Sequence, residues 1–194
     1  MIETRNLSQY VEIHASNRYG RGKSIKRKML APWVFLRRPK SILDYGAGKN
    51  LMVEWFIAPG ATVRHRFDPA VPAIATIPLL RYDLVTNTDV LEHLDESEIG
   101  AVLDDIRARC EDALFLVDTR EAKTILPNGE NAHATVRPAE WWLARVREFF
   151  PASELISSSN GRAYIRTWKA GTFAKVIAPP LRYLLLLAPY ETVR

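Results

Sequence analysis

The sequence has few of the residues that cross-link or anchor a protein: one cysteine, Cys110, in 194 residues, and no long apolar run. A single cysteine excludes an internal disulfide and a cysteine-built zinc site, and it is typical of a reducing compartment. No apolar stretch is long enough to span a bilayer, and residues 1–10 lack the apolar core of a signal peptide. We therefore expect a cytoplasmic protein.

Most of the chain also lacks a large excess of positive or negative charge, and the positive charge is concentrated in residues 1–40. Ten Lys or Arg stand against Glu3 and Glu12 in residues 1–40, so this segment carries +8 and the other 154 residues carry −3. A basic segment suits a phosphate-bearing substrate, a nucleic acid or an anionic membrane surface, although a solvated helix face is commoner. The composition, 47% hydrophobic and 25% charged, is that of one globular domain.

Glycine is sparse, with nine residues, but two of them stand in one turn. The apolar run 42–45 ends at Gly46-Ala47-Gly48, and apolar residues then recur at helical spacing over 51–56. Strand, glycine turn and helix form the first unit of a doubly wound sheet, whose ligands lie at the carboxyl ends of the strands. The third glycine of the dinucleotide fingerprint is missing, which disfavours a pyrophosphate ligand.

This turn resembles the Asp-x-Gly-x-Gly loop of class I S-adenosylmethionine-dependent methyltransferases, with Asp44, Gly46 and Gly48 at the matching positions. In that family the loop packs against the methionine and ribose parts of the cofactor. The resemblance therefore implies an enzyme that uses S-adenosylmethionine, with Asp44, Gly46, Ala47 and Gly48 as cofactor-binding residues. For the loop alone, an ordinary glycine turn in another α/β domain remains open.

Asp68 stands at the end of a strand expected over 61–67, and it follows Gly48 by 20 residues. That spacing is typical of the acidic residue in nucleotide-binding folds. The resemblance assigns Asp68 to the ribose hydroxyls, and a carboxylate suits this role because it offers two acceptor oxygens. Segment 69–81 holds three prolines and is too short for a helix and a strand, so we expect a shortened or displaced third strand.

A strand expected over 82–88 leads into Asp89-Val-Leu-Glu-His-Leu94. Many methyltransferases that act on small molecules have a similar turn after the fourth strand, so the resemblance places Asp89 and Val90 beside the adenine or methionine. A histidine after a glutamate at a helix start is otherwise more commonly a cap or packing residue. We assign no metal-ligand set from the sequence.

Two known routes of base methylation are disfavoured. The Asn/Asp-Pro-Pro-Tyr/Phe tetrapeptide of amino-methylating nucleic-acid enzymes is missing after 82–88, where Asn87 to Val90 stand instead. Carbon-5 pyrimidine enzymes need a nucleophilic cysteine. Cys110 falls near the end of the helix expected over 97–109, far from the glycine turn.

The polar loop 121–137 is long for a compact domain, which is typical of a working loop. Class I methyltransferases commonly bind substrate here, so the resemblance implies substrate contacts from Arg120, Asn131 and Trp142. His133 is our general-base candidate, because a neutral imidazole can take the proton of an attacking hydroxyl. A purely structural role for His133 within the loop is the alternative.

Asn160-Gly161 between two strand-like runs predicts a hairpin, which matches the last two strands of the methyltransferase sheet. The Leu-Pro-Asn-Gly-x-Asn-Ala-His run ending at His133, the Trp-Trp pair and Tyr19-Gly20 resemble small bacterial and phage-encoded methyltransferases of undetermined substrate. We predict an α/β, Rossmann-like class I methyltransferase fold. Its mostly parallel seven-stranded sheet would end in an antiparallel hairpin and be shortened around strand 3.

We expect three parts: a basic arm with lid helices (1–40), the methyltransferase core (41–169) and an apolar tail (170–194). In many class I methyltransferases a segment before the first strand folds over the cofactor. Tyr19 is therefore a cofactor-binding candidate, and His14 and Lys23 are candidates for closing the site. The tail either packs back on the sheet, forms a homodimer contact or touches a membrane surface.

The expected activity is transfer of the S-adenosylmethionine methyl group to a small polar acceptor, at oxygen, such as a sugar, a nucleotide or another metabolite. Two other functions remain open. One is a nucleic-acid-modifying methyltransferase that uses the basic arm, and the other is an S-adenosylmethionine-binding protein without catalysis. A nicotinamide-dependent dehydrogenase ranks last. The sequence does not identify the acceptor.

Overall fold

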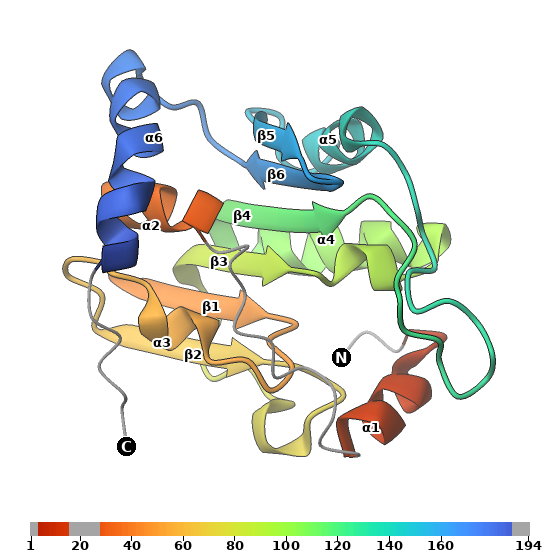
Figure 1. The fold of residues 1–194 in the computed structure, drawn as a ribbon. Coiled ribbons are helices and arrows are strands. Elements are labelled where there is room, and N and C mark those ends of the chain that lie inside the picture. Colours follow the sequence, from red (N-terminus) through yellow and green to blue (C-terminus); the bar gives the residue numbers. More distant parts are fainter. Residues whose placement is uncertain (1–3, 16–27, 188–194) are drawn as a thin grey trace.

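Six strands form one mixed sheet in the computed structural model, which describes residues 4–15 and 28–187 (Figure 1). The sheet order is β2-β1-β3-β4-β6-β5, with parallel pairing from β2 to β4 and antiparallel pairing of β6 with both neighbours. The strands are β1 (Ser41–Tyr45), β2 (Val63–Phe67), β3 (Tyr82–Thr88), β4 (Cys110–Asp118), β5 (Glu154–Ser159) and β6 (Arg162–Arg166).

Helices cover both faces of this sheet (Figure 1). One core cluster joins α4 and α5 to the face that carries Val85 and Phe115, and a second joins α2, α3 and α6 to the face that carries Leu84 and Leu114. The described helices are α1 (Leu7–Ala15), α2 (Ala31–Arg37), α3 (Met52–Trp55), α4 (Glu96–Arg109), α5 (Ala139–Arg147) and α6 (Thr172–Leu187), with 3-10 turns η2 (Pro72–Ile74) and η3 (Leu91–His93).

The predicted Rossmann-like topology is confirmed, and the sheet has six strands where seven were expected. The difference lies in segment 69–81, which forms η2 and no strand. Proline fixes φ and lacks the N–H that a strand must donate, so Pro69, Pro72 and Pro78 prevent a regular strand here. β2 is therefore the edge of the sheet on this side.

The hairpin predicted at Asn160-Gly161 joins β5 to β6, and both residues have positive φ, 53° and 68°. Register pairs Asp118 with Arg162 and Leu114 with Arg166, so β6 runs from the carboxyl end of β4 back toward its amino end. After β6, α6 packs against α2 and buries Ala178 in the second core cluster. No helix in the described ranges is long and apolar enough to cross a membrane.

α1 lies beside the carboxyl ends of β1 and β2 and next to the long loop after β4 (Figure 1). Arg5, just before α1, forms an ion pair with Asp95 at 2.9 Å. Gln9 accepts a hydrogen bond from the backbone N–H of Asn128 in the long loop at 3.0 Å. These contacts fix the helix at the edge where a Rossmann-like sheet binds its ligands.

Trp142 is fully buried in the core between α5 and the sheet, whereas Trp141 is only partly buried. We expect Trp142→Ala to lower the free energy of unfolding by about 3–5 kcal/mol, because it removes a large core side chain and leaves a cavity. Trp141→Ala is the matched control and should cost less. Urea denaturation measures both, and equal losses would contradict this assignment of the core face.

Candidate functional site

The turn after β1 is held against the end of β2 in a form that requires glycine. Gly46 and Gly48 have φ values of 81° and 53°, in the left-handed region that favours glycine. A Cβ atom on Gly46 would lie 2.3 Å from Cγ2 of Val90, so no side chain fits between this turn and the start of η3. The N–H groups of Gly46 and Ala47 donate to the carbonyl of Phe67 at 2.8 and 3.0 Å.

Asp68 binds this turn directly. Its Oδ2 accepts the N–H of Gly48 at 2.7 Å and its Oδ1 accepts the N–H of Ala70 at 2.9 Å. The carboxylate is 8% exposed. Each oxygen keeps a second lone pair, so Asp68 can still accept hydrogen bonds from a ligand at the carboxyl ends of β1 and β2.

Two further polar side chains lie at or near this edge of the sheet. Asp44 is buried within β1, and its Oδ1 accepts the hydroxyl of Thr86 at 2.8 Å. Asn87 is buried at the end of β3 and donates from Nδ2 to the carbonyl of Tyr45 at 2.9 Å. No donor in residues 4–15 or 28–187 reaches Oδ1 of Asn87, which leaves a buried acceptor at the edge.

His14 of α1 lies against the glycine turn. A Cβ atom on Gly48 would be 3.1 Å from Cε1 of His14, which is 6% exposed. Burial lowers the pKa of His14 below its ordinary value, and the negative charge of Asp68 opposes this shift only in part. The imidazole is therefore neutral near pH 7. Tyr19 and Lys23, the other residues predicted to close the site, lie outside the described residues.

A second group of polar residues gathers where η3 meets the long loop. The rings of His93 and His133 are 4.9 Å apart. Nδ1 of His93 donates to the carbonyl of Ala132 at 2.8 Å, and Nδ1 of His133 donates to the carbonyl of Arg120 at 2.5 Å. The hydroxyl of Tyr10, on α1, also donates to Ala132 at 2.8 Å and lies 2.9 Å from Nδ1 of His93.

Glu92 lies close to both of these histidines and is fully buried. Its Oε1 accepts the N–H of Asp118 at 2.8 Å, which ties η3 to the end of β4. Burial alone would raise the pKa of Asp118, but the hydrogen bond and charge of Arg120 and the charge of Arg162 hold it below its ordinary value. Asp118 is therefore an anion paired with two cations.

Two of the three predicted substrate residues, Arg120 and Asn131, lie beside His133, whereas Trp142 lies in the core. Asn131 braces the loop: its Oδ1 accepts the N–H groups of Ala122 and His133, and its Nδ2 donates to the carbonyl of Ala122. The guanidinium of Arg120 is bidentate on Asp118, while its carbonyl orients His133. The prediction for Trp142 is corrected, because its side chain is 0% exposed in the core and is not accessible to a substrate.

Sequence reasoning did not assign Tyr10, Glu92 or His93 to the site. The motif that contains Glu92 and His93 served to identify the family and indicated catalysis only weakly, although a buried glutamate beside a histidine can transfer a proton or bind a cation. Tyr10 and His14 are four residues apart, so they share one face of α1. That spacing was the signal that both point at the same edge of the sheet.

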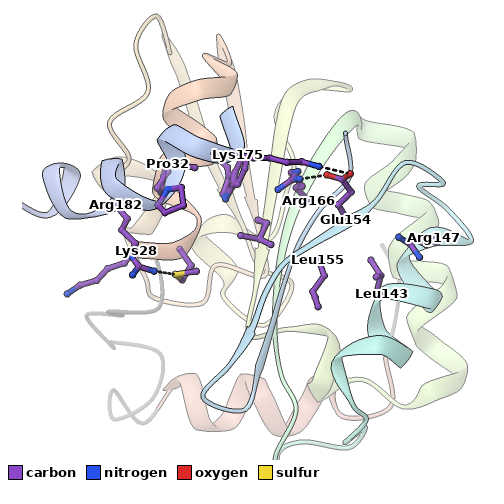
Figure 2. Close-up of a pocket in the computed structure, with 14 residues that line it drawn as sticks. Lys28, Pro32, Leu143, Arg147, Glu154, Leu155, Arg166, Lys175 and Arg182 are labelled. Carbon is purple, nitrogen blue, oxygen red and sulfur yellow. Dashed lines mark hydrogen bonds and ion pairs between the residues drawn. The ribbon is translucent and has the colours of Figure 1, made fainter. Parts of the chain in front are cut away.

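Two other features lie away from this edge. Cys110 is buried at the amino end of β4, and burial raises the pKa of its thiol to about 12, so it is no nucleophile. A cavity of about 560 Å³ lies between α2, α6 and the hairpin, where Glu154 pairs with Arg166 and Lys175 (Figure 2). By register, Arg166 lies toward the amino end of β4, so the cavity and the glycine turn are separate sites.

A family model described as a methyltransferase domain matches residues 15–175. No curated protein sequence matches the chain. Solved structures with a similar fold include Burkholderia thailandensis 1,6-didemethyltoxoflavin-N1-methyltransferase with bound 1,6-didemethyltoxoflavin and S-adenosylhomocysteine (17% identity, TM-score 0.52, 82% of this chain and 84% of that one). A second is DhpI with S-adenosylhomocysteine (16% identity, TM-score 0.56, 83% of this chain and 93% of that one). A third is human N-acetylserotonin methyltransferase with S-adenosylmethionine (12% identity, TM-score 0.58, 86% of this chain and 57% of that one).

Gly46 and Gly60 together test the packing of the glycine turn. Both have positive φ, 81° and 90°, but no atom lies within 4 Å of a Cβ on Gly60. We expect Gly60→Ala to cost only backbone strain, about 1–2 kcal/mol. Gly46→Ala should cost about 1–3 kcal/mol more in the free energy of unfolding, because the new methyl meets Val90. Equal losses in chemical denaturation would show that the turn has room to move.

Proposed function

Because the chain belongs to the methyltransferase-domain family, we propose that it transfers the methyl group of S-adenosylmethionine to an oxygen of a small polar acceptor. The observation that carries this proposal is the contact of Asp68 with the N–H of Gly48 at 2.7 Å. It joins an acidic acceptor at the end of β2 to a glycine turn at the end of β1.

The residues at this edge fit the adenosine part of the cofactor. Ribose hydroxyls are donors, and Asp68 has acceptor lone pairs left for them. Asn87 adds a buried acceptor that no described donor reaches. Gly46, Ala47 and Gly48 have little or no side chain, so the methionine part would lie against their backbone, and Val90 closes the turn from the side of η3 together with Asp89. His14 lies against Gly48 and would contact the bound cofactor.

The adenine side differs from the usual arrangement, because segment 69–81 forms no third strand. Ala70 and η2 directly follow Asp68, whose Oδ1 accepts the N–H of Ala70. We place the adenine against this proline-containing segment. Its contacts are therefore mostly apolar and with backbone, since Ile74, Ile77 and Leu79 are among its larger side chains.

The acceptor side is formed by His133 and the long loop. The cofactor brings an activated methyl group on a sulfonium, and the protein mainly aligns the acceptor with it. Because Nδ1 of His133 donates to Arg120, the Nε2 atom is the one left to act on the acceptor. The acceptor class includes sugars, nucleotides and other hydroxylated metabolites.

Calorimetric titration tests the cofactor. We expect S-adenosylmethionine and S-adenosylhomocysteine to bind with micromolar dissociation constants, whereas NAD should not bind. Asp68→Ala should weaken both sulfur ligands at least about tenfold, because loss of a charged hydrogen-bond acceptor costs about 1.5–3 kcal/mol.

Asp83→Ala is the matched control for this titration. Asp83 accepts hydrogen bonds from the N–H groups of Lys40 and Ser41 at the amino end of β3, away from the glycine turn. Its removal should leave the affinity unchanged. If well-folded wild-type protein bound neither sulfur ligand, or if both variants bound equally, the proposed cofactor site would be wrong.

A further inference from the structure

We propose that Glu92, His93 and His133 bind a divalent transition-metal cation, which holds an acceptor with two neighbouring oxygens in front of the methyl group. This inference rests on the proposed methyl transfer and names the substrate class of the same site. It also gives His133 a different role from the general base that its sequence context predicts.

The three side chains converge from two segments. One ligand atom from each, a carboxylate oxygen and two imidazole nitrogens, lies within 4.8 Å of the other two. Bonds of about 2.0–2.2 Å to a cation require these atoms to approach one another by up to about 1.5 Å more. The loop that carries His133 can supply this movement, since the side chain is partly exposed and its loop is long.

Both histidines are already in the tautomer that binds a metal. A carbonyl oxygen can only accept, so the bonds to Ala132 and Arg120 require that each Nδ1 carries its proton. In the neutral imidazoles, each Nε2 then has a lone pair. Metal-binding histidines almost always donate their other N–H to a carbonyl or carboxylate in this way, which fixes the ring. Two independent carbonyls do this here.

The carboxylate is equally well fixed. Glu92 is fully buried, and the N–H of Asp118 holds its Oε1 at 2.8 Å. The N–H of Thr135 donates to the Glu92 carbonyl at 3.0 Å, which ties η3 to the histidine loop. The Glu92 residue is thereby held in place through both its side chain and its backbone.

Two imidazoles and one carboxylate select the type of cation. This set suits Mn²⁺, Fe²⁺ or Zn²⁺, whereas Mg²⁺ prefers oxygen ligands alone. Three protein ligands leave other coordination positions open. Two neighbouring oxygens, as in a vicinal diol or a hydroxy acid, fill two open positions from one molecule. The acceptor is therefore a chelating one.

The position of the cluster suits the reaction. Val90, which contacts the glycine turn, directly precedes η3, and η3 carries Glu92 and His93. A cation lowers the pKa of a bound hydroxyl, so the hydroxyl proton leaves to water. An oxygen lone pair forms the new bond to the methyl carbon, and the electrons of the breaking C–S bond return to sulfur. S-adenosylhomocysteine is the leaving group.

The test measures binding of Mn²⁺ to metal-stripped protein by electron paramagnetic resonance, in which bound Mn²⁺ loses the six-line signal of the free ion. We expect one bound equivalent, displaced by equimolar Zn²⁺ because Zn²⁺ is the stronger binder. His93→Gln, His133→Gln and Glu92→Gln should each weaken binding at least about tenfold. Glu92→Gln keeps an oxygen for the N–H of Asp118 and replaces the other carboxylate oxygen with an amide NH2 group, which does not bind a cation.

His65→Gln is the matched control, because His65 lies on β2 and bonds to the hydroxyl of Tyr82 at 2.8 Å, outside the cluster. It should bind Mn²⁺ like the wild type. Each variant is first checked for an unchanged unfolding midpoint without metal. Because the His133 side chain is partly exposed, His133→Gln keeps the test valid if Glu92→Gln does not fold. No stoichiometric binding, or full binding by both histidine variants, would overturn the proposal.

Calorimetry with S-adenosylhomocysteine on the same samples separates this inference from the proposed function. Cofactor affinity should be unchanged in metal-stripped protein and in His133→Gln. Cofactor binding without Mn²⁺ binding would overturn the metal site and leave the methyltransferase proposal standing. Mn²⁺ binding without cofactor binding would overturn the methyltransferase proposal and leave the metal site standing.

Discussion

The site depends on one steric constraint, the lack of space for a side chain at position 46. The turn after β1 passes so close to Val90 that a Cβ atom would overlap it. This close approach brings the end of β1 against the segment that leads into η3. It also lets the N–H groups of Gly46 and Ala47 reach the carbonyl of Phe67 at the end of β2. Three strand ends are thereby fixed around one short turn.

The missing third strand changes what this edge can do. In its place, η2 and several prolines follow Asp68, and Asp68 bonds to Ala70 within its own segment. The acidic residue is thus positioned by local contacts, by the N–H of Gly48 on one side and that of Ala70 on the other. A further strand is not needed to orient Asp68, the proposed ribose acceptor, which explains how the fold tolerates the absence of that strand.

Local patterns predicted the parts of the structure that local physics determines. The glycine turn and the Asn160-Gly161 hairpin each follow from backbone preferences within a few residues, and the 20-residue spacing to Asp68 follows from the length of one strand–helix–strand unit. The cluster of Glu92, His93 and His133 could not be found this way, because η3 and the loop meet about 40 residues apart through backbone carbonyls. Trp142 was misplaced for a different reason: buried positions 139, 142 and 146 fix the phase of α5, and that spacing was readable.

One helix connects the two halves of the site. Within α1, His14 lies against the glycine turn and Tyr10 contacts His93 and Ala132. These residues are four positions apart, so they project from the same face and cannot move independently. Movement of α1 away from the sheet would uncover the glycine turn and remove a hydrogen bond from the histidine cluster at the same time. Under the proposed function, α1 therefore couples cofactor binding to the positioning of the acceptor.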